Sequence, residues 1–199
     1  MIDLARKIAT LGFVFAVYFF ILRKKPYYGI KLYPLYWYRT AKAEGWKRIL
    51  RVLLLSIPII ILLYFLLPII NNFAESLVGG VPSVEPGRNP IATMVGISPY
   101  LLLFVSIFVP IIEEWLCRYV LLEEFRAKWG VKWAVFLSAS VFALLHLTNR
   151  GFALHSTLVP FIAGLIYAGM YLKWGLKAAV FAHSGNNAFR TLLWMLGFE

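Results

Sequence analysis

The feature that most constrains this chain is a long apolar run, Val52–Ile70. Its 19 residues carry no charge, and only Ser56, Pro58 and Pro68 interrupt the large hydrophobic side chains. An α-helix needs about 20 apolar residues to cross the roughly 30 Å hydrocarbon core of a bilayer, because it rises about 1.5 Å per residue. The run is therefore typical of a transmembrane helix, and it predicts that the chain folds in a membrane.

The composition of the whole chain agrees with a membrane protein. Apolar residues make up 61% of the 199 residues and charged residues only 15%, whereas soluble domains have about 45–50% and about 25%. These proportions exclude a disordered chain. The single cysteine, Cys117, excludes an internal disulfide and a cysteine-rich zinc module. We therefore expect an all-α, polytopic helical bundle in the membrane.

About six hydrophobic segments are expected to form this bundle. The first is so short that it either spans with snorkelling ends or lies in the interface. The stretch Asn71–Pro90 is expected to be a loop because it is rich in glycine and proline. The third segment continues without a helix breaker from Ile112 to Gly130. The six segments are Ile8–Leu22, Val52–Ile70, Ile91–Ile112, Trp133–Leu147, Leu158–Leu172 and Leu176–Phe198.

The loop Arg23–Arg51 is strongly basic. It holds nine Lys or Arg residues against Glu44 alone, and such an excess marks the cytoplasmic side of a membrane protein and attracts anionic lipid. The aromatic residues between these cations suit an interfacial belt better than nucleic-acid stacking, so we expect no nucleic-acid partner. The sequence contains no glutamine and only one aspartate, Asp3, which favours a thermophilic prokaryote with the protein in its cell membrane.

Glu113, Glu114 and Arg118 form the first polar cluster on an apolar segment. On an α-helix Glu114 and Arg118 lie four residues apart on one face and are expected to form an ion pair. Glu113 points about 100° away, which leaves it without a cation on its own helix face. The alternative is that these charges merely mark the cytoplasmic end of the span, although the apolar run continues to Leu122.

Two further polar clusters lie on later segments. Phe142 and His146 are four residues apart and are expected to stack on one helix face. His183, Asn187 and Arg190 form a polar stripe on the last segment, where the small residues of the segment before it would permit close packing. Each cluster taken alone also fits a structural hydrogen-bonding seam.

The three clusters together favour chemistry, because ionisable groups within a membrane each cost about 2.5–3.5 kcal/mol and need a partner or a purpose. Their estimated depths allow them to converge from the cytoplasmic side. Glu113 and a histidine can hold and deprotonate a water, while a second histidine and Asn187 can donate hydrogen bonds to an oxyanion. The set is therefore suited to hydrolysis of a carbonyl compound.

The ordered motifs resemble those of the CPBP family, which comprises the type II CAAX prenyl proteases and the bacteriocin-processing (Abi) enzymes. The resemblance covers roughly Ile91–Arg190, whereas the segments before it match only in being hydrophobic and basic. We expect residues 1–90 to hold the N-terminal segments with the basic loop, and residues 91–199 the catalytic core, within one bundle. The motifs are Glu113-Glu114-x-x-x-Arg118, Phe142-x-x-x-His146, Phe161-x-x-Gly164 and His183-x-x-x-Asn187.

The resemblance implies an intramembrane glutamate endopeptidase that requires no metal or other cofactor. It assigns Glu113 as the general base and His146 as a residue that positions the water. His183 and Asn187 would form the oxyanion site, while Glu114, Arg118 and Phe142 would shape the site. The substrate would be a peptide or a prenylated protein, and the cavity would open to the cytoplasm. The chain is shorter than the eukaryotic prenyl proteases, which leaves recognition of the CAAX sequence open.

Other functions remain open at this stage. Glu113, His146 and His183 could in principle coordinate zinc, although no His-Glu-x-x-His motif occurs. Catalysis by a serine at Ser184 lacks the Gly-x-Ser-x-Gly context, and Cys117 is better explained as a small core residue. A non-catalytic immunity protein, scaffold or small transporter would use the same polar seam for assembly.

Overall fold

The computed structural model describes residues 12, 16–25, 27–29, 39–40, 42–80, 98–147 and 154–197. The chain divides into two compact units, Met1–Trp46 and Lys47–Glu199. In the first unit a short π-helix, η1 (Tyr18–Leu22), is described. Residues 8–11 and 13–15 of the expected segment Ile8–Leu22 lie outside the described residues, as do residues 26, 30–38 and 41 of the basic loop.

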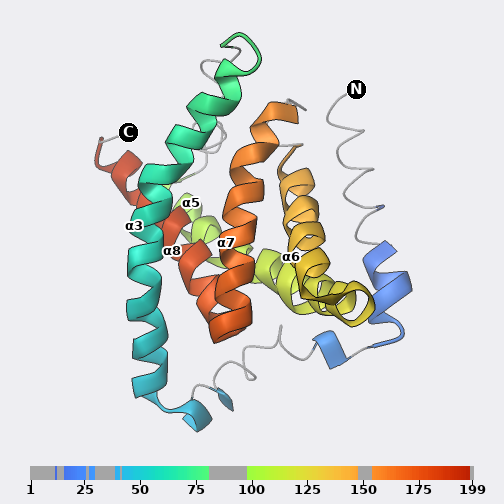
Figure 1. Ribbon diagram of the computed structural model, residues 1–199. Helices are drawn as coiled ribbons and strands as arrows, with labels where there is room; N and C mark the ends of the chain where they lie inside the picture. Colours follow the sequence, from blue (N-terminus) through green and yellow to red (C-terminus); the bar gives the residue numbers. More distant parts are fainter. Residues whose placement is uncertain are drawn as a thin grey trace. The chain divides into compact units, whose positions relative to one another are not determined.

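The described part of the second unit is built from helices and turns, without strands. The all-α class expected from the sequence is confirmed. Figure 1 shows α6 and α7 side by side, with α8 beside α7. The elements in chain order are α3 (Trp46–Ser76), α5 (Pro99–Glu114), η3 (Trp115–Leu122), α6 (Glu123–Leu147), η5 (Leu154–Thr157), α7 (Leu158–Trp174) and α8 (Leu176–Met195).

Three helical stretches in the described residues are long and apolar enough to cross a membrane. They are Trp46–Ser76, Tyr100–Leu147 and His155–Trp174, so a membrane-type bundle is confirmed. The 48-residue stretch combines two of the expected segments, which are joined by a kink at Gly130, where the backbone is not helical (φ 78°, ψ 173°). α8 also has 20 residues, but its polar stripe lowers its mean hydropathy, so it is not one of these three stretches.

The expectation of a loop from Asn71 onward is wrong for its first residues. α3 continues to Ser76, because the side-chain amide of Asn71 donates to Glu75 Oε1 at 2.9 Å one turn later. No glycine interrupts the chain between Asn71 and Gly79. Gly79 and Gly80 then adopt positive φ angles of 75° and 78°, which glycine does without steric cost. The helix therefore ends just before the two glycines, which form the turn that follows it.

Close packing of α6 against α7 positions the site. A Cβ atom added at Gly164 of α7 would lie 3.2 Å from Cα and Cβ of Ala139 and 3.3 Å from Phe142 of α6. The small residue therefore permits close helix contact, as expected, and the helix that approaches it is α6. A Cβ atom added at Gly169, further along α7, would meet nothing within 4 Å among the described residues.

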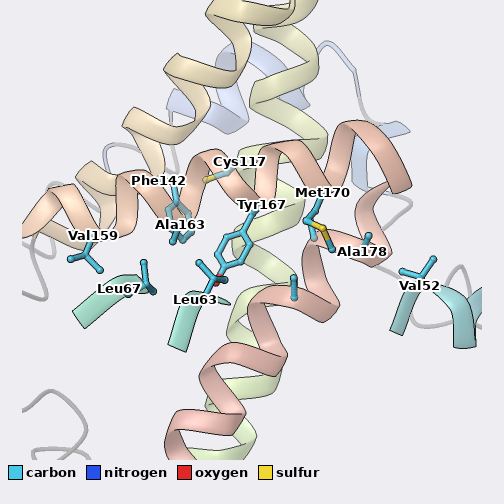
Figure 2. Close-up of a cluster of buried hydrophobic side chains, with 12 residues drawn as sticks. Val52, Leu63, Leu67, Cys117, Phe142, Val159, Ala163, Tyr167, Met170 and Ala178 are labelled. Carbon is cyan, nitrogen blue, oxygen red and sulfur yellow. The ribbon is translucent and has the colours of Figure 1, made fainter. Parts of the chain in front are cut away.

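A core of apolar side chains joins α3 to the other helices of this unit. It includes Leu63 and Leu67 of α3, Phe142 of α6 and Tyr167 of α7 (Figure 2). Cys117, which lies in η3, is completely buried in the same cluster. The interpretation of this cysteine as a small core residue is confirmed.

Candidate active site

The paired carboxylates lie at the junction of α5 and η3. Glu114 is completely buried, and its Oε2 lies 3.1 Å from Nε of Arg118, which is equally buried. The expected ion pair between residues four apart is therefore confirmed. The helix changes from α to π geometry directly after Glu114, and such π segments occur frequently at functional sites.

Arg118 connects this junction to helices α7 and α6. Its Nη2 donates to the carbonyl oxygen of Gly164 on α7 at 3.2 Å, and its guanidinium carbon lies 4.7 Å from the centre of the Phe142 ring on α6. A buried guanidinium is tolerated only when hydrogen bonds and an opposite charge compensate for its lost hydration. The contacts of Arg118 supply both, and they fix the position of Glu114.

His183 of α8 lies between the two carboxylates. Its Nδ1 donates to Glu114 Oε1 at 2.9 Å, and its Nε2 lies 3.6 Å from Glu113 Oε2. The side chain of Glu113 is 27% exposed while that of Glu114 is 0% exposed. The neighbouring glutamates therefore have different environments: Glu114 is buried and bonded to the imidazole, and Glu113 is partly exposed.

Two aromatic rings hold the imidazole of His183 from its sides. The ring of Tyr167 stacks on it at a centroid distance of 4.6 Å and an angle of 17°, and Phe142 meets it edge-on at 5.5 Å and 77°. The sequence analysis did not identify Tyr167. Its place among the small residues of the segment, one turn after Gly164, was the available signal, because small residues mark the face that packs against other helices.

His146 reaches this cluster through Phe142. The two rings lie against each other on one helix face, as expected from their spacing, with centroids 4.5 Å apart and planes tilted by 45°. His146 Nδ1 donates to the Phe142 carbonyl oxygen at 2.9 Å. The contact found for Glu113 is with His183 rather than His146. The water between Glu113 and His146 stays a prediction.

The remaining polar residues of α8 lie beyond His183. The amide of Asn186 donates to Asn187 Oδ1 at 3.4 Å. Arg190 donates from Nη2 to the backbone carbonyl oxygen of Tyr64 on α3 at 3.3 Å. α8 thus presents a histidine, an amide and a guanidinium in successive turns.

The geometry bears on the alternatives that the sequence left open. Ser184 donates its hydroxyl to the Ile107 carbonyl oxygen at 2.8 Å, a structural bond between α8 and α5. Within the described ranges, no group of three or more His, Cys, Asp or Glu side chains is arranged to hold a metal ion. His155 is partly buried and lines a cavity of about 410 Å³.

The comparison with protein families gives a match over the region of the site. Residues 96–189, just under half of the chain, match the family described as "Type II CAAX prenyl endopeptidase Rce1-like", which confirms the resemblance seen in the motifs. No curated protein and no solved structure matches the chain. The family indicates a membrane protein that acts as a protease.

Proposed function

We propose, from the premise that residues 96–189 form an Rce1-like domain, that this protein is an intramembrane endopeptidase with Glu113 as its general base. The observation that carries the proposal is the contact of 3.6 Å between Glu113 Oε2 and His183 Nε2. Because the other ring nitrogen is bonded to buried Glu114, the imidazole keeps a fixed orientation towards the accessible carboxylate.

In the first step Glu113 removes a proton from a water molecule while the water oxygen attacks the carbonyl carbon of the peptide bond. General-base catalysis of this kind contributes about 10²–10⁴-fold in rate. His146 would help to position the water. Its ring lies against the ring of Phe142, which also contacts the ring of His183.

In the second step the carbonyl oxygen becomes an oxyanion that needs hydrogen-bond donors. A His183 ring that carries protons on both nitrogens donates from Nδ1 to Glu114 and presents Nε2–H to the oxyanion, and the Asn187 amide is the second donor. Collapse of the intermediate breaks the C–N bond, and Glu113 returns its proton to the departing amine. One water is consumed, and the products are a carboxylic acid and an amine.

The substrate class follows from the family and from the membrane setting. We infer a peptide or a prenylated protein whose tail reaches a site opening to the cytoplasm, with anionic lipid near the basic segment Arg23–Arg51. The host would be a prokaryote, with the protein in its cell membrane.

The proposal is tested by product analysis with the purified full-length protein. Peptides with a C-terminal Cys-aliphatic-aliphatic-X tail, farnesylated and unmodified, are incubated in detergent, and the products are identified by mass spectrometry. We expect product pairs whose masses sum to the substrate plus one water, with the same yield after metal stripping and in the presence of a chelator.

An Asn187→Ala variant shows that the activity belongs to this chain rather than to a contaminant. Loss of one oxyanion donor lowers kcat by about 10²–10³-fold. If the folded wild-type protein cleaves nothing across the panel, the proposal fails and a non-catalytic membrane scaffold is supported. If chelation abolishes cleavage and zinc restores it, the mechanism is metal-dependent.

A further inference from the structure

A cavity of about 410 Å³ lies between the end of α3 and helices α6 and α7. Its volume is that of a small-molecule site, since such pockets have about 300–1,000 Å³. Most of the described residues that line it are apolar, and none of them is assigned to catalysis. The cavity is therefore a feature that the proposed mechanism does not use. Its lining includes Ala74, Leu77, Ala143, Leu144, His155 and Phe161.

Three helix ends meet at this cavity. α3 ends at Ser76, α6 ends at Leu147, and α7 begins at Leu158. α3 has 31 residues, so it is about 46 Å long. This length exceeds the roughly 30 Å of the hydrocarbon core and reaches the headgroups, which bring the bilayer to about 40–45 Å. The cavity at the helix ends therefore lies where the hydrocarbon of a membrane meets the headgroups.

The apolar lining continues into the lipid-facing surface of α3. Ala74 and Ala143 are 1% and 4% exposed and form the inner wall of the cavity, whereas Leu77 and Leu144 are largely exposed. Leu77 and Leu144 therefore lie at its mouth. Next to Ala74 in the chain, Phe73 is also largely exposed. In a membrane the molecules that reach such a mouth are lipids.

His155 brings an unpaired polar atom to this lining. Its Nε2 is buried and has no hydrogen-bond partner among the described residues. Buried polar atoms nearly always have a partner, so an unpaired one beside a cavity indicates a group that binds there. A ring nitrogen of histidine that carries a proton donates a hydrogen bond. The ligand should therefore combine an apolar chain with an oxygen that accepts.

We propose that the cavity binds an acyl chain of a membrane phospholipid, while His155 Nε2 donates to an ester or phosphate oxygen of the same molecule. A purely apolar ligand would leave Nε2 unpaired, and a purely polar one would not match the alanine and leucine side chains. The bound lipid fills the space between α3 and the pair of helices α6 and α7. It therefore stabilises the folded protein in proportion to the occupancy of the site.

The test is photolabelling of the purified full-length protein in detergent. The probe is a phosphatidylglycerol with a diazirine on one acyl chain, and the labelled peptides are identified by mass spectrometry. We expect saturable labelling within residues 140–144 and 155–161, which unlabelled phosphatidylglycerol prevents. A farnesylated CAAX peptide should not prevent it, because the lining contains none of the residues assigned to catalysis. The thermal midpoint should rise as phosphatidylglycerol is added.

Two variants of His155 test the hydrogen bond. His155→Phe keeps an aromatic ring but removes the donor, and it should weaken lipid binding by about 2- to 10-fold, the range of a neutral hydrogen bond. His155→Gln should bind nearly as well as the wild type, because its side-chain amide can donate in place of Nε2.

A third variant tests the cavity itself. Ser140 lines it, and its hydroxyl donates to the Phe136 carbonyl oxygen of its own helix. Ser140→Phe adds an aromatic ring to the cavity and should abolish the saturable labelling. Val131→Phe is the matched control, because Val131 is 50% exposed on the same helix and does not line the cavity. It should be labelled like the wild type.

Every other outcome overturns the proposal. Labelling that does not saturate and spreads over the exposed face of α3 shows only the lipid that surrounds any membrane protein. Displacement by the farnesylated peptide assigns the cavity to the substrate, and an absence of label shows that protein fills it. Equal binding by His155→Phe removes the role of His155. No peptide hydrolysis enters these measurements, so failure of the proposed function does not alter their result.

Discussion

Helices α3 and α8 distribute polar and apolar side chains in opposite ways. α3 exposes large apolar residues along its length, whereas α8 buries polar ones. This is the reverse of the arrangement in a water-soluble bundle, and it follows if lipid surrounds the helices. The exposed residues of α3 include Leu54, Ile57, Phe65, Ile69 and Phe73, and the buried residues of α8 include His183, Ser184, Asn186 and Thr191.

Three of the buried polar residues of α8 have partners on α5, whereas the amide of Asn186 donates to Asn187 of its own helix. The hydroxyl of Thr191 lies 2.8 Å from that of Ser106, Ser184 donates to a backbone carbonyl of α5, and His183 bonds to Glu114. The comparison teaches that the helix with buried polar side chains bonds most of them to a neighbouring helix, because buried polarity is costly, while the apolar surface of α3 needs no protein partner. Substitutions at paired and at lipid-facing positions should therefore differ widely in effect.

The largest loss of stability is expected at the buried ion pair. Arg118→Ala leaves the carboxylate of Glu114 buried without its cation, and breaking such a pair costs about 3–5 kcal/mol. The measurement is the free energy of unfolding in detergent. The double variant Glu114→Gln with Arg118→Met should be more stable than Arg118→Ala, because it leaves no buried charge. A double variant as unstable as the single one would contradict the account.

Two positions on α3 test the comparison within one helix. Leu63 is 0% exposed and Ile69 is 65% exposed. Leu63→Ala should lower the free energy of unfolding by about 2–5 kcal/mol, because it leaves a cavity in the core. Ile69→Ala should change the free energy of unfolding by less than about 0.5 kcal/mol, because this side chain faces hydrocarbon in the folded and in the unfolded protein alike. Similar losses at both positions would show that the exposed face of α3 is covered by protein.

A smaller loss is expected where α6 and α7 approach each other. Gly164→Val places methyl groups against the Ala139 backbone and should cost about 1–3 kcal/mol. Gly169→Val, on the exposed side of the same helix, is the matched control and should leave the thermal midpoint almost unchanged. If both variants melt at the wild-type temperature, the close approach at Gly164 does not limit stability.

The sequence could predict the features that depend on local spacing. The long helices follow from the apolar runs, and the pairs Glu114–Arg118 and Phe142–His146 follow from a separation of four residues on a helix. The end of α3 was misjudged because the loop was predicted from glycines and prolines that begin only at Gly79, whereas Asn71 and Glu75 before them bond to each other along the helix.

The contacts between helices were beyond the reach of the sequence. Whether His183 meets Glu113, Glu114 or both depends on how α8 crosses α5, which no local pattern specifies. The same is true of Tyr167, whose ring stacks on His183 from a third helix. Glu114 was assigned to Arg118 alone, yet its two oxygens serve Arg118 and His183 at once. The catalytic roles of these residues stay predictions.

The most direct test of the central claim is the rate of peptide hydrolysis by Glu113→Gln. This variant keeps the shape of the side chain but cannot accept a proton, so kcat should fall by about 10²–10⁴-fold while the thermal midpoint stays near that of the wild type. Glu123→Gln is the matched control, because Glu123 is 25% exposed and forms an ion pair with Arg126; it should retain wild-type kcat. Turnover by Glu113→Gln at the wild-type rate would contradict the account.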